Sequence, residues 1–184
     1  FHLGTYVESA EKTEGGVKLT AAKGDKQLEI EAEKVLVAVG RKPNTGGLGA
    51  AEAGVALDER GCIKIDAEWQ TSVPGIYAIG DVVAGPMLAH KAEQEAVAAV
   101  ERMAGQPGSV NYDAIPSVIY TAPEVAAVGL TEAAAKANGH ETALGVFPFQ
   151  ANGRAVAGGH ADGLAKVIAD KASGRVLGAQ ILSA

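Results

Sequence analysis

Alternating apolar and polar residues near the N-terminus predict a small antiparallel sheet. In residues 27–33, Leu28 and Ile30 lie on one face, while glutamate and glutamine side chains lie on the other. This period of two is typical of a half-solvated strand. Residues 6–12 and 17–20 predict two further strands, and glycine-containing turns separate all three. We therefore expect a three-stranded meander.

Two continuous apolar runs predict buried strands. Residues 34–39, Lys-Val-Leu-Val-Ala-Val, are apolar on both faces, as in a central parallel strand. Residues 76–79, Ile-Tyr-Ala-Ile, form a shorter run of the same kind. Gly80, which lets a ligand approach the backbone, and the carboxylate of Asp81 follow it. Because ligands of open α/β sheets bind beyond the carboxyl ends of strands, we expect Asp81 to face a crevice.

A helix is predicted shortly after Asp81. Gly85 and Pro86 form a turn, and small or apolar residues then recur at helical spacing: Ala92, Ala96, Ala99, Val100 and Met103. The charged residues between them are expected to form a solvated face: Lys91, Glu93, Glu95 and Glu101. Free N–H groups at a helix start attract electron-rich groups. A carboxylate beside such a start suits a ligand that combines a polyol with an electron-rich ring.

The remaining chain predicts shorter elements. Between these runs we expect a helical patch at residues 48–53, a turn at 58–61 and a strand at 62–66. Residues 105–113 have the composition of a linker. Beyond it, five strands and one helix predict an α+β unit. The strands are expected at 117–120, 125–129, 142–149, 163–169 and 175–182, and the helix between Thr131 and Gly139.

Composition limits the class of protein. The chain has 184 residues, a net charge of −6 and no long basic cluster, which argues against nucleic-acid or anionic-membrane binding. We find neither a stretch long enough to span a membrane nor a signal peptide. The single cysteine, Cys62, cannot form an internal disulfide, and a reducing compartment follows. A bacterial cytoplasm and a mitochondrial matrix are the compartments that the family resemblance described below implies.

One block resembles a known flavin-binding motif. Residues 71–81, Thr-Ser-Val-Pro-Gly-Ile-Tyr-Ala-Ile-Gly-Asp, resemble the second flavin-binding motif of the flavoprotein disulfide reductases. Residues 87–90, Met-Leu-Ala-His, are similar to the version in the dihydrolipoamide dehydrogenase branch. Glutathione reductases have Leu-Thr-Pro in place of Leu-Ala-His. The resemblance implies an FAD site in which Asp81 binds a ribityl hydroxyl, and to which Gly80 and the backbone of Met87, Leu88, Ala89 and His90 contribute.

Two further blocks extend the resemblance over almost the whole chain. Residues 38–44, Ala-Val-Gly-Arg-Lys-Pro-Asn, resemble the end of the family's NAD-binding domain, which implies that Gly40 lies against NAD and that Val7 contacts it through its backbone. By itself Gly40 would be an ordinary turn residue. Residues 115–131 are similar to the start of the dimerisation domain, which implies a homodimer. Lipoyl-bearing subunits of 2-oxo acid dehydrogenase complexes are the implied partners.

We therefore expect an α/β part followed by an α+β part. Residues 1–41 would end an NAD-binding domain, residues 42–113 would form the C-terminal part of an FAD-binding domain, and residues 114–184 would begin a dimerisation domain. The family's Cys-x4-Cys disulfide, His-Glu base and Gly-x-Gly-x-x-Gly loops are absent from this sequence. We expect an internal-to-late segment without catalytic residues or metal ligands, and inactive by itself.

Two alternatives stay open at this point. The chain could come from a sister flavoprotein reductase that acts on another substrate, such as a mercuric or glutathione reductase. It could also be a non-catalytic module that uses residues 114–184 as a dimer surface.

Overall fold

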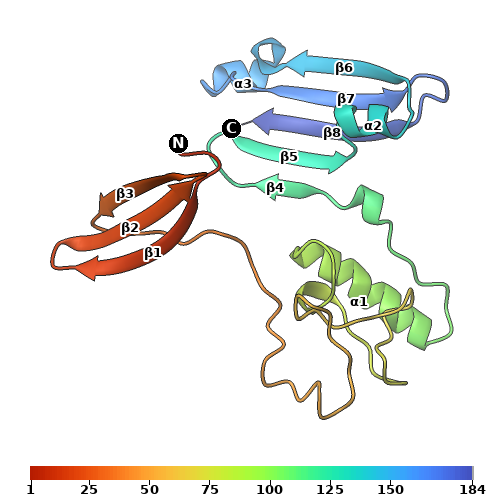
Figure 1. Ribbon diagram of the computed structural model, residues 1–184. Coiled ribbons are helices and arrows are strands. Elements are labelled where there is room, and N and C mark those ends of the chain that lie inside the picture. The colour runs from red at the N-terminus through yellow and green to blue at the C-terminus, as the bar shows by residue number, and fades with distance from the viewer. Residues whose placement is uncertain (184) are drawn as a thin grey trace. The chain divides into compact units, whose positions relative to one another are not determined.

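The computed structural model describes residues 1–183, which form two compact units, Phe1–Arg41 and the chain from Lys42 onward. The first unit is the predicted meander. Strands β1 (Tyr6–Thr13), β2 (Gly16–Lys23) and β3 (Lys26–Ala32) pair antiparallel in this order (Figure 1). The alternation expected for β3 is confirmed, because Leu28 and Ile30 are half-buried while Glu29 and Glu31 are exposed.

The apolar run at residues 34–39 is not a strand, and this prediction was wrong. The segment is extended but belongs to no ladder, and Leu36, Val37 and Val39 are 90%, 75% and 93% exposed. A central parallel strand needs parallel neighbours on both edges and a cover on both faces. The three strands of this unit are antiparallel to one another. They provide residues 34–39 with neither parallel neighbours nor a cover on both faces.

Residues 42–88 form an irregular layer in which backbone bridges replace the expected strands. Residues 62–66 and 76–79 contribute only isolated bridges, including Ile63 to Val83 and Gln70 to Tyr77. The expected helix at 48–53 is a series of turns. A small core of Val55, Ile63, Ala78 and Val83 holds the layer together. The turn at 58–61 is confirmed: the Asp58 carboxylate accepts two backbone N–H groups, and Gly61 has φ +82°.

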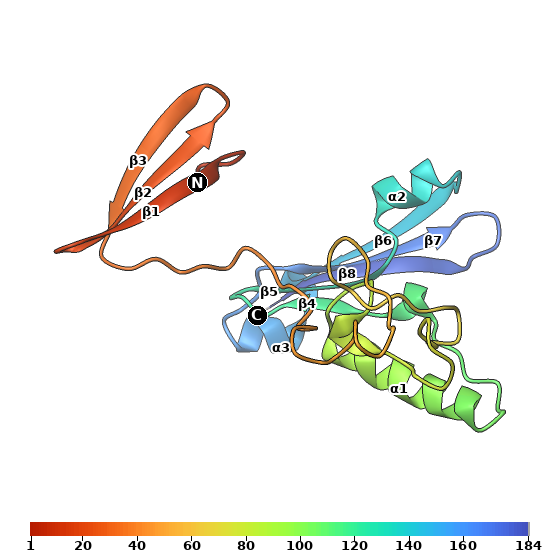
Figure 2. The same cartoon turned by 60° about the horizontal axis from the view of Figure 1, so that its bottom comes forward.

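Helix α1 (Ala89–Met103) lies against this layer (Figure 2), as predicted. Its apolar contact face is narrower than expected. Ala98 and Ala99 pack against the buried Trp69, whereas Val100 and Met103 are 62% and 50% exposed.

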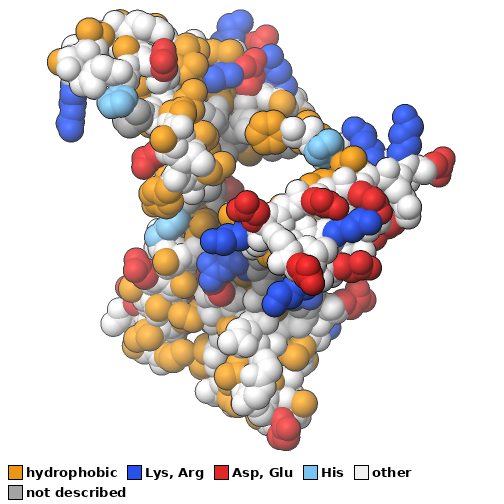
Figure 3. All heavy atoms as spheres, turned by 90° about the vertical axis from the view of Figure 1, so that its left-hand side faces the viewer, with side chains coloured by type: hydrophobic (Ala, Val, Ile, Leu, Met, Phe, Trp, Pro, Cys, Tyr) orange, Lys and Arg blue, Asp and Glu red, His pale blue; other side chains and the backbone are white. Residues whose placement is uncertain are grey.

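Figure 3 shows one face of the molecule, on which acidic and basic side chains are interspersed.

The expected solvated face of α1 is partly wrong, because it contains a buried ion pair. Lys91 and Glu95 are 0% and 1% exposed, and their Nζ and Oε1 atoms are 3.1 Å apart. Glu93 is exposed, as predicted. Glu95 lies one turn and Lys91 two turns before Ala98 and Ala99, so the same stripe of the helix carries the pair and the apolar contacts.

The C-terminal part is a five-stranded antiparallel sheet of order β4-β5-β8-β7-β6 (Figure 1). All five predicted strands are present, as β4 (Ser117–Ile119), β5 (Glu124–Gly129), β6 (Thr142–Pro148), β7 (Leu164–Asp170) and β8 (Val176–Ser183). Helix α2 (Glu132–Ala137) is capped by Thr131, whose Oγ1 accepts the Ala134 N–H at 3.1 Å. A short helix, α3 (Gly153–Ala157), was not predicted.

Helix α2 is tied to the sheet by packing and by charge. Ala135 and Ile168 are both fully buried. Glu132 accepts from Lys166 of β7 and from Lys136 of its own helix, each at 2.7 Å. The hydrogen bonds from these two lysines lower the pKa of Glu132 to about 2. Among the described residues, no helix is both long and apolar enough to cross a membrane.

The buried ion pair yields a stability prediction. The substitution Glu95→Gln should lower the free energy of unfolding by about 3–5 kcal/mol, because it leaves the Lys91 ammonium buried without its counter-charge. Adding Lys91→Met should recover part of this loss, since the unpaired charge is then gone. Urea unfolding followed by circular dichroism measures both changes.

The control for this prediction is the other i, i+4 lysine–glutamate pair, Lys136 and Glu132 of α2, in which the Lys136 side chain is 59% exposed. Lys136→Gln should change stability much less than Glu95→Gln, because solvent screens the exposed pair. Equal losses from the two substitutions would contradict a special role for burial.

A second prediction concerns stability in acid. Hydrogen bonds from the Ser173 backbone and from His140, whose Nδ1 lies 2.8 Å from Asp170 Oδ2, lower the pKa of Asp170 to about 2. An unfolded aspartate titrates near pH ~3.9, so the stabilisation is complete above this pH and is lost as pH falls towards 2. Asp170→Asn should therefore flatten the fall of Tm between pH 5 and pH 2. If thermal scans show the same dependence of Tm on pH in this variant and in the unmodified protein, the stabilising role of Asp170 is disproved.

Candidate functional site

The motif at residues 71–81 ends in a short 3₁₀ helix, η1 (Gly80–Val82), which carries Asp81. Gly80 has φ +75°, a conformation that favours glycine. A Cβ at Gly80 would lie 3.2 Å from the Cβ of Ala92, so the absence of a side chain lets η1 come close to α1. The Asp81 residue is half-buried at this junction.

The second half of the predicted site is the start of α1. Its N-cap residue Leu88 is extended and provides no side-chain cap for the first N–H groups, which belong to Ala89, His90 and Lys91. Met87, Leu88 and His90 are half-buried, and Ala89 is exposed. The positive end of the helix dipole therefore has its first backbone donors free of side-chain capping.

The donor set fits the groups of a flavin cofactor. A half-buried carboxylate can accept a hydrogen bond from a polyol hydroxyl, and backbone N–H groups at a helix start can donate to a carbonyl oxygen. Gly80 has a different part in this arrangement. Its N–H donates to Glu95 Oε2 at 2.8 Å and its carbonyl accepts from Lys91 Nζ at 3.2 Å, so its polar groups are already bonded within the protein.

The side chain of His90 is also engaged within the chain. Its Nε2 lies 2.6 Å from the carbonyl oxygen of Pro116, so this nitrogen is the donor. The contact joins the first turn of α1 to the segment that enters β4. The His90 backbone N–H, by contrast, belongs to the helix start that has no side-chain cap.

The two residues expected near NAD lie in the first unit. Val7 is in β1, 63% exposed, where the ladder with β2 is irregular between Val7 and Ser9. Such a bulge leaves backbone groups outside the regular pairing. Gly40 is exposed and has φ +115°, in the region that only glycine adopts readily.

Sequence reasoning missed the residues that support this site, namely Lys91, Glu95, Trp69 and Tyr112. Tyr112 Oη donates to Glu95 Oε1 at 2.8 Å and accepts from Trp69 Nε1 at 3.2 Å. A signal for the charged pair was present: Lys91, Glu95, Ala98 and Ala99 share one helical stripe. Nothing in the sequence indicated that Tyr112, in a linker, would reach that stripe.

Other chemistry is sparse in the described chain. Cys62 is a buried free thiol inside the irregular layer. Among residues 1–183, no three His, Cys, Asp or Glu side chains are grouped so as to hold a metal ion.

Comparisons with known proteins give the same family for both halves of the chain. Residues 1–96 match the model of the pyridine nucleotide-disulphide oxidoreductases, and residues 115–184 match the dimerisation domain of that family. The chain is 49% identical to a dihydrolipoyl dehydrogenase of Cupriavidus necator over its whole length, and it covers 39% of that protein. It is also 49% identical to the human mitochondrial dihydrolipoyl dehydrogenase, of which it covers 36%.

Solved structures agree with this assignment. LpdA of Mycobacterium tuberculosis matches 97% of the chain with a TM-score of 0.86 and 27% identity, and the chain covers 39% of it. The flavoprotein disulfide reductase RclA of Escherichia coli matches 97% of the chain with a TM-score of 0.83 and 28% identity, and the chain covers 40% of it. The expected fold class, α/β followed by α+β, is confirmed.

The resemblance expected from residues 71–90 is thus confirmed along the entire sequence. The chain spans well under half the length of the relatives it matches. Because one family model covers more than half of the chain and its companion covers most of the rest, the chain belongs to the pyridine nucleotide-disulphide oxidoreductase family.

Proposed function

We propose that this chain is the part of a dihydrolipoyl dehydrogenase that completes the flavin site and begins the dimer interface. The whole enzyme would reoxidise protein-bound dihydrolipoamide and pass electrons through a disulfide and FAD to NAD. The 49% identity to dihydrolipoyl dehydrogenases supports this branch over sister reductases, since RclA is only 28% identical. We assign residues 1–41 to the NAD-binding domain, 42–113 to the FAD-binding domain and 114–184 to the dimerisation domain.

The observation that carries the flavin assignment is the junction of η1 with α1. In our proposal Asp81 accepts a hydrogen bond from a ribityl hydroxyl of FAD, and the backbone of Met87, Leu88, Ala89 and His90 faces the flavin ring. The half-buried carboxylate and the N–H groups left without a side-chain cap support this. Gly80 contributes by allowing the close approach of η1 to α1. FAD would supply the two-electron chemistry between the dithiol and NAD.

The chain's own residues bind and orient the cofactor, and none of them takes part in bond making. A negative charge or carbonyl oxygen near the start of α1 gains ~0.3–1 kcal/mol from the helix dipole. For a two-electron couple, ~1.4 kcal/mol corresponds to about 30 mV. The helix can therefore tune a flavin potential by tens of millivolts at most.

We also propose the contacts to NAD and to protein partners. Gly40 and the backbone of Val7 would lie against NAD, supported by the glycine-type φ at Gly40 and the bulge after Val7. The match of residues 115–184 to a dimerisation domain supports a homodimer. Lipoyl-bearing subunits of 2-oxo acid dehydrogenase complexes would be the substrate carriers. A bacterial cytoplasm or a mitochondrial matrix would be the compartment, in line with the bacterial and mitochondrial relatives.

The flavin assignment predicts the effect of removing one charge. In the full-length protein that carries this chain, Asp81→Asn should raise the Kd for FAD by about 10- to 100-fold, because a hydrogen bond to a charged group contributes ~1.5–3 kcal/mol. Fluorescence titration of the apoprotein with FAD measures this. Glu59→Gln, at an exposed position of the same layer, is the control and should leave the Kd unchanged. Equal Kd values for Asp81→Asn and the unmodified protein would refute the assignment.

A further prediction concerns residues 1–184 expressed by themselves. This chain should purify without FAD and should not reduce NAD with dihydrolipoamide, since it has one cysteine and no phosphate-binding Gly-x-Gly-x-x-Gly loop. The absorbance of the purified chain near 450 nm and a turnover assay are the measurements. A yellow, active preparation would show that these residues hold FAD and catalyse without the rest of the enzyme.

A further inference from the structure

A continuous set of hydrogen bonds leads from the linker after α1 to the backbone of Gly80. Trp69 Nε1 donates to Tyr112 Oη at 3.2 Å, and Tyr112 Oη donates to Glu95 Oε1 at 2.8 Å. Glu95 Oε2 then accepts the Gly80 N–H at 2.8 Å. Burial and the hydrogen bond to Glu95 raise the pKa of Tyr112, which keeps its hydroxyl a donor at neutral pH.

Lys91 makes the same connection from the other side. Its Nζ lies 3.1 Å from Glu95 Oε1 and donates to the Gly80 carbonyl at 3.2 Å. The same Nζ lies 3.6 Å from the point where a Cβ on Gly85 would be. The ammonium group therefore contacts the backbone before Asp81, at Gly80, and lies near Gly85 on the other side of it.

Tyr112 itself is held in place by its own segment. It begins a short 3₁₀ helix, η2 (Tyr112–Ala114), and four residues after Tyr112 the Pro116 carbonyl accepts from His90 Nε2 at 2.6 Å. Residues 112–116 are thus attached to α1 at two points, His90 and Glu95. No buried side-chain nitrogen or oxygen of the described residues lacks a hydrogen-bond partner, so the network is complete as it stands.

We propose that Tyr112, Glu95 and Lys91 are positioning residues of the flavin site, which hold η1, and with it Asp81, at a fixed place relative to the start of α1. This inference rests on the proposed function. The Tyr112 hydroxyl makes no described hydrogen bond to η1 or to the first turn of α1. It influences the position of η1 through Glu95, which binds the Gly80 N–H. It therefore links the entry to the dimerisation domain with the flavin motif.

A double-mutant cycle in the full-length protein tests this inference. Tyr112→Phe removes one oxygen atom from a residue that is 49% exposed, so the fold should survive. It should raise the Kd for FAD by about five- to tenfold when Asp81 is present. In an Asp81→Asn background the same change should alter the Kd by less than about twofold, because Tyr112 acts through Asp81.

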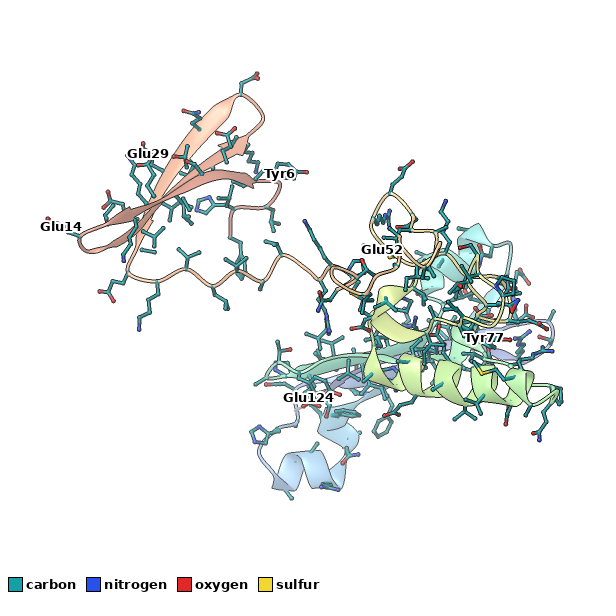
Figure 4. All side chains as sticks on the ribbon, turned by 90° about the horizontal axis from the view of Figure 1, so that it is seen from below. Tyr6, Glu14, Glu29, Glu52, Tyr77 and Glu124 are labelled. Carbon is teal, nitrogen blue, oxygen red and sulfur yellow. The ribbon has the colours of Figure 1, made fainter. Side chains whose placement is uncertain are left out.

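The matched control is Tyr77→Phe. Tyr77 packs against the same cluster of Trp69, Ala98 and Ala99 and lies beside α1 (Figure 4), but its hydroxyl is not part of the network. This control should leave the Kd for FAD unchanged in both backgrounds. Equal effects of Tyr112→Phe with and without Asp81, or no effect at all, would overturn the inference alone. An unmodified full-length protein that binds no FAD would overturn the proposed function and this inference together.

Discussion

A buried ion pair on one helix controls the geometry of the candidate site. Lys91 and Glu95 have both lost contact with water, which is costly for charged groups unless they find partners inside the protein. Their partners are each other, both polar groups of the Gly80 backbone, and the Tyr112 hydroxyl. Because these partners come from three separate segments, the pair can keep its bonds only if all three segments stay in register.

This requirement explains why an irregular layer can carry a defined site. Residues 42–88 have few regular backbone ladders, and single bridges and a small core around Val83 hold them. Such a layer would ordinarily position a side chain loosely. Charged groups of α1 bind the backbone of Gly80, and Gly80 has no Cβ that would press on Ala92. Together these two features hold η1 in a fixed position against α1.

The two sheets show how far a local pattern can specify a structure. Strands β1 to β3 and β4 to β8 are antiparallel, and each set finds its hydrogen-bond partners within its own part of the chain, so the predicted and observed strands agree. Residues 34–39 carry an equally strong apolar signal, but a parallel strand takes its partners from distant sequence. The described chain supplies none to this segment, and its valines stay exposed.

The sequence by itself determined the antiparallel strands, the helix at Ala89, the caps at Thr131 and Gly139, and the family, because these depend on periodicity, turn residues and local motifs. It also identified Asp81 and residues 87–90 as the candidate flavin contacts. Only the tertiary structure decided that Lys91 and Glu95 are buried and that Tyr112 reaches them. A charge on a helix is solvated or buried according to what packs on that face, and the packing partners, Gly80 and a linker tyrosine, are distant in sequence.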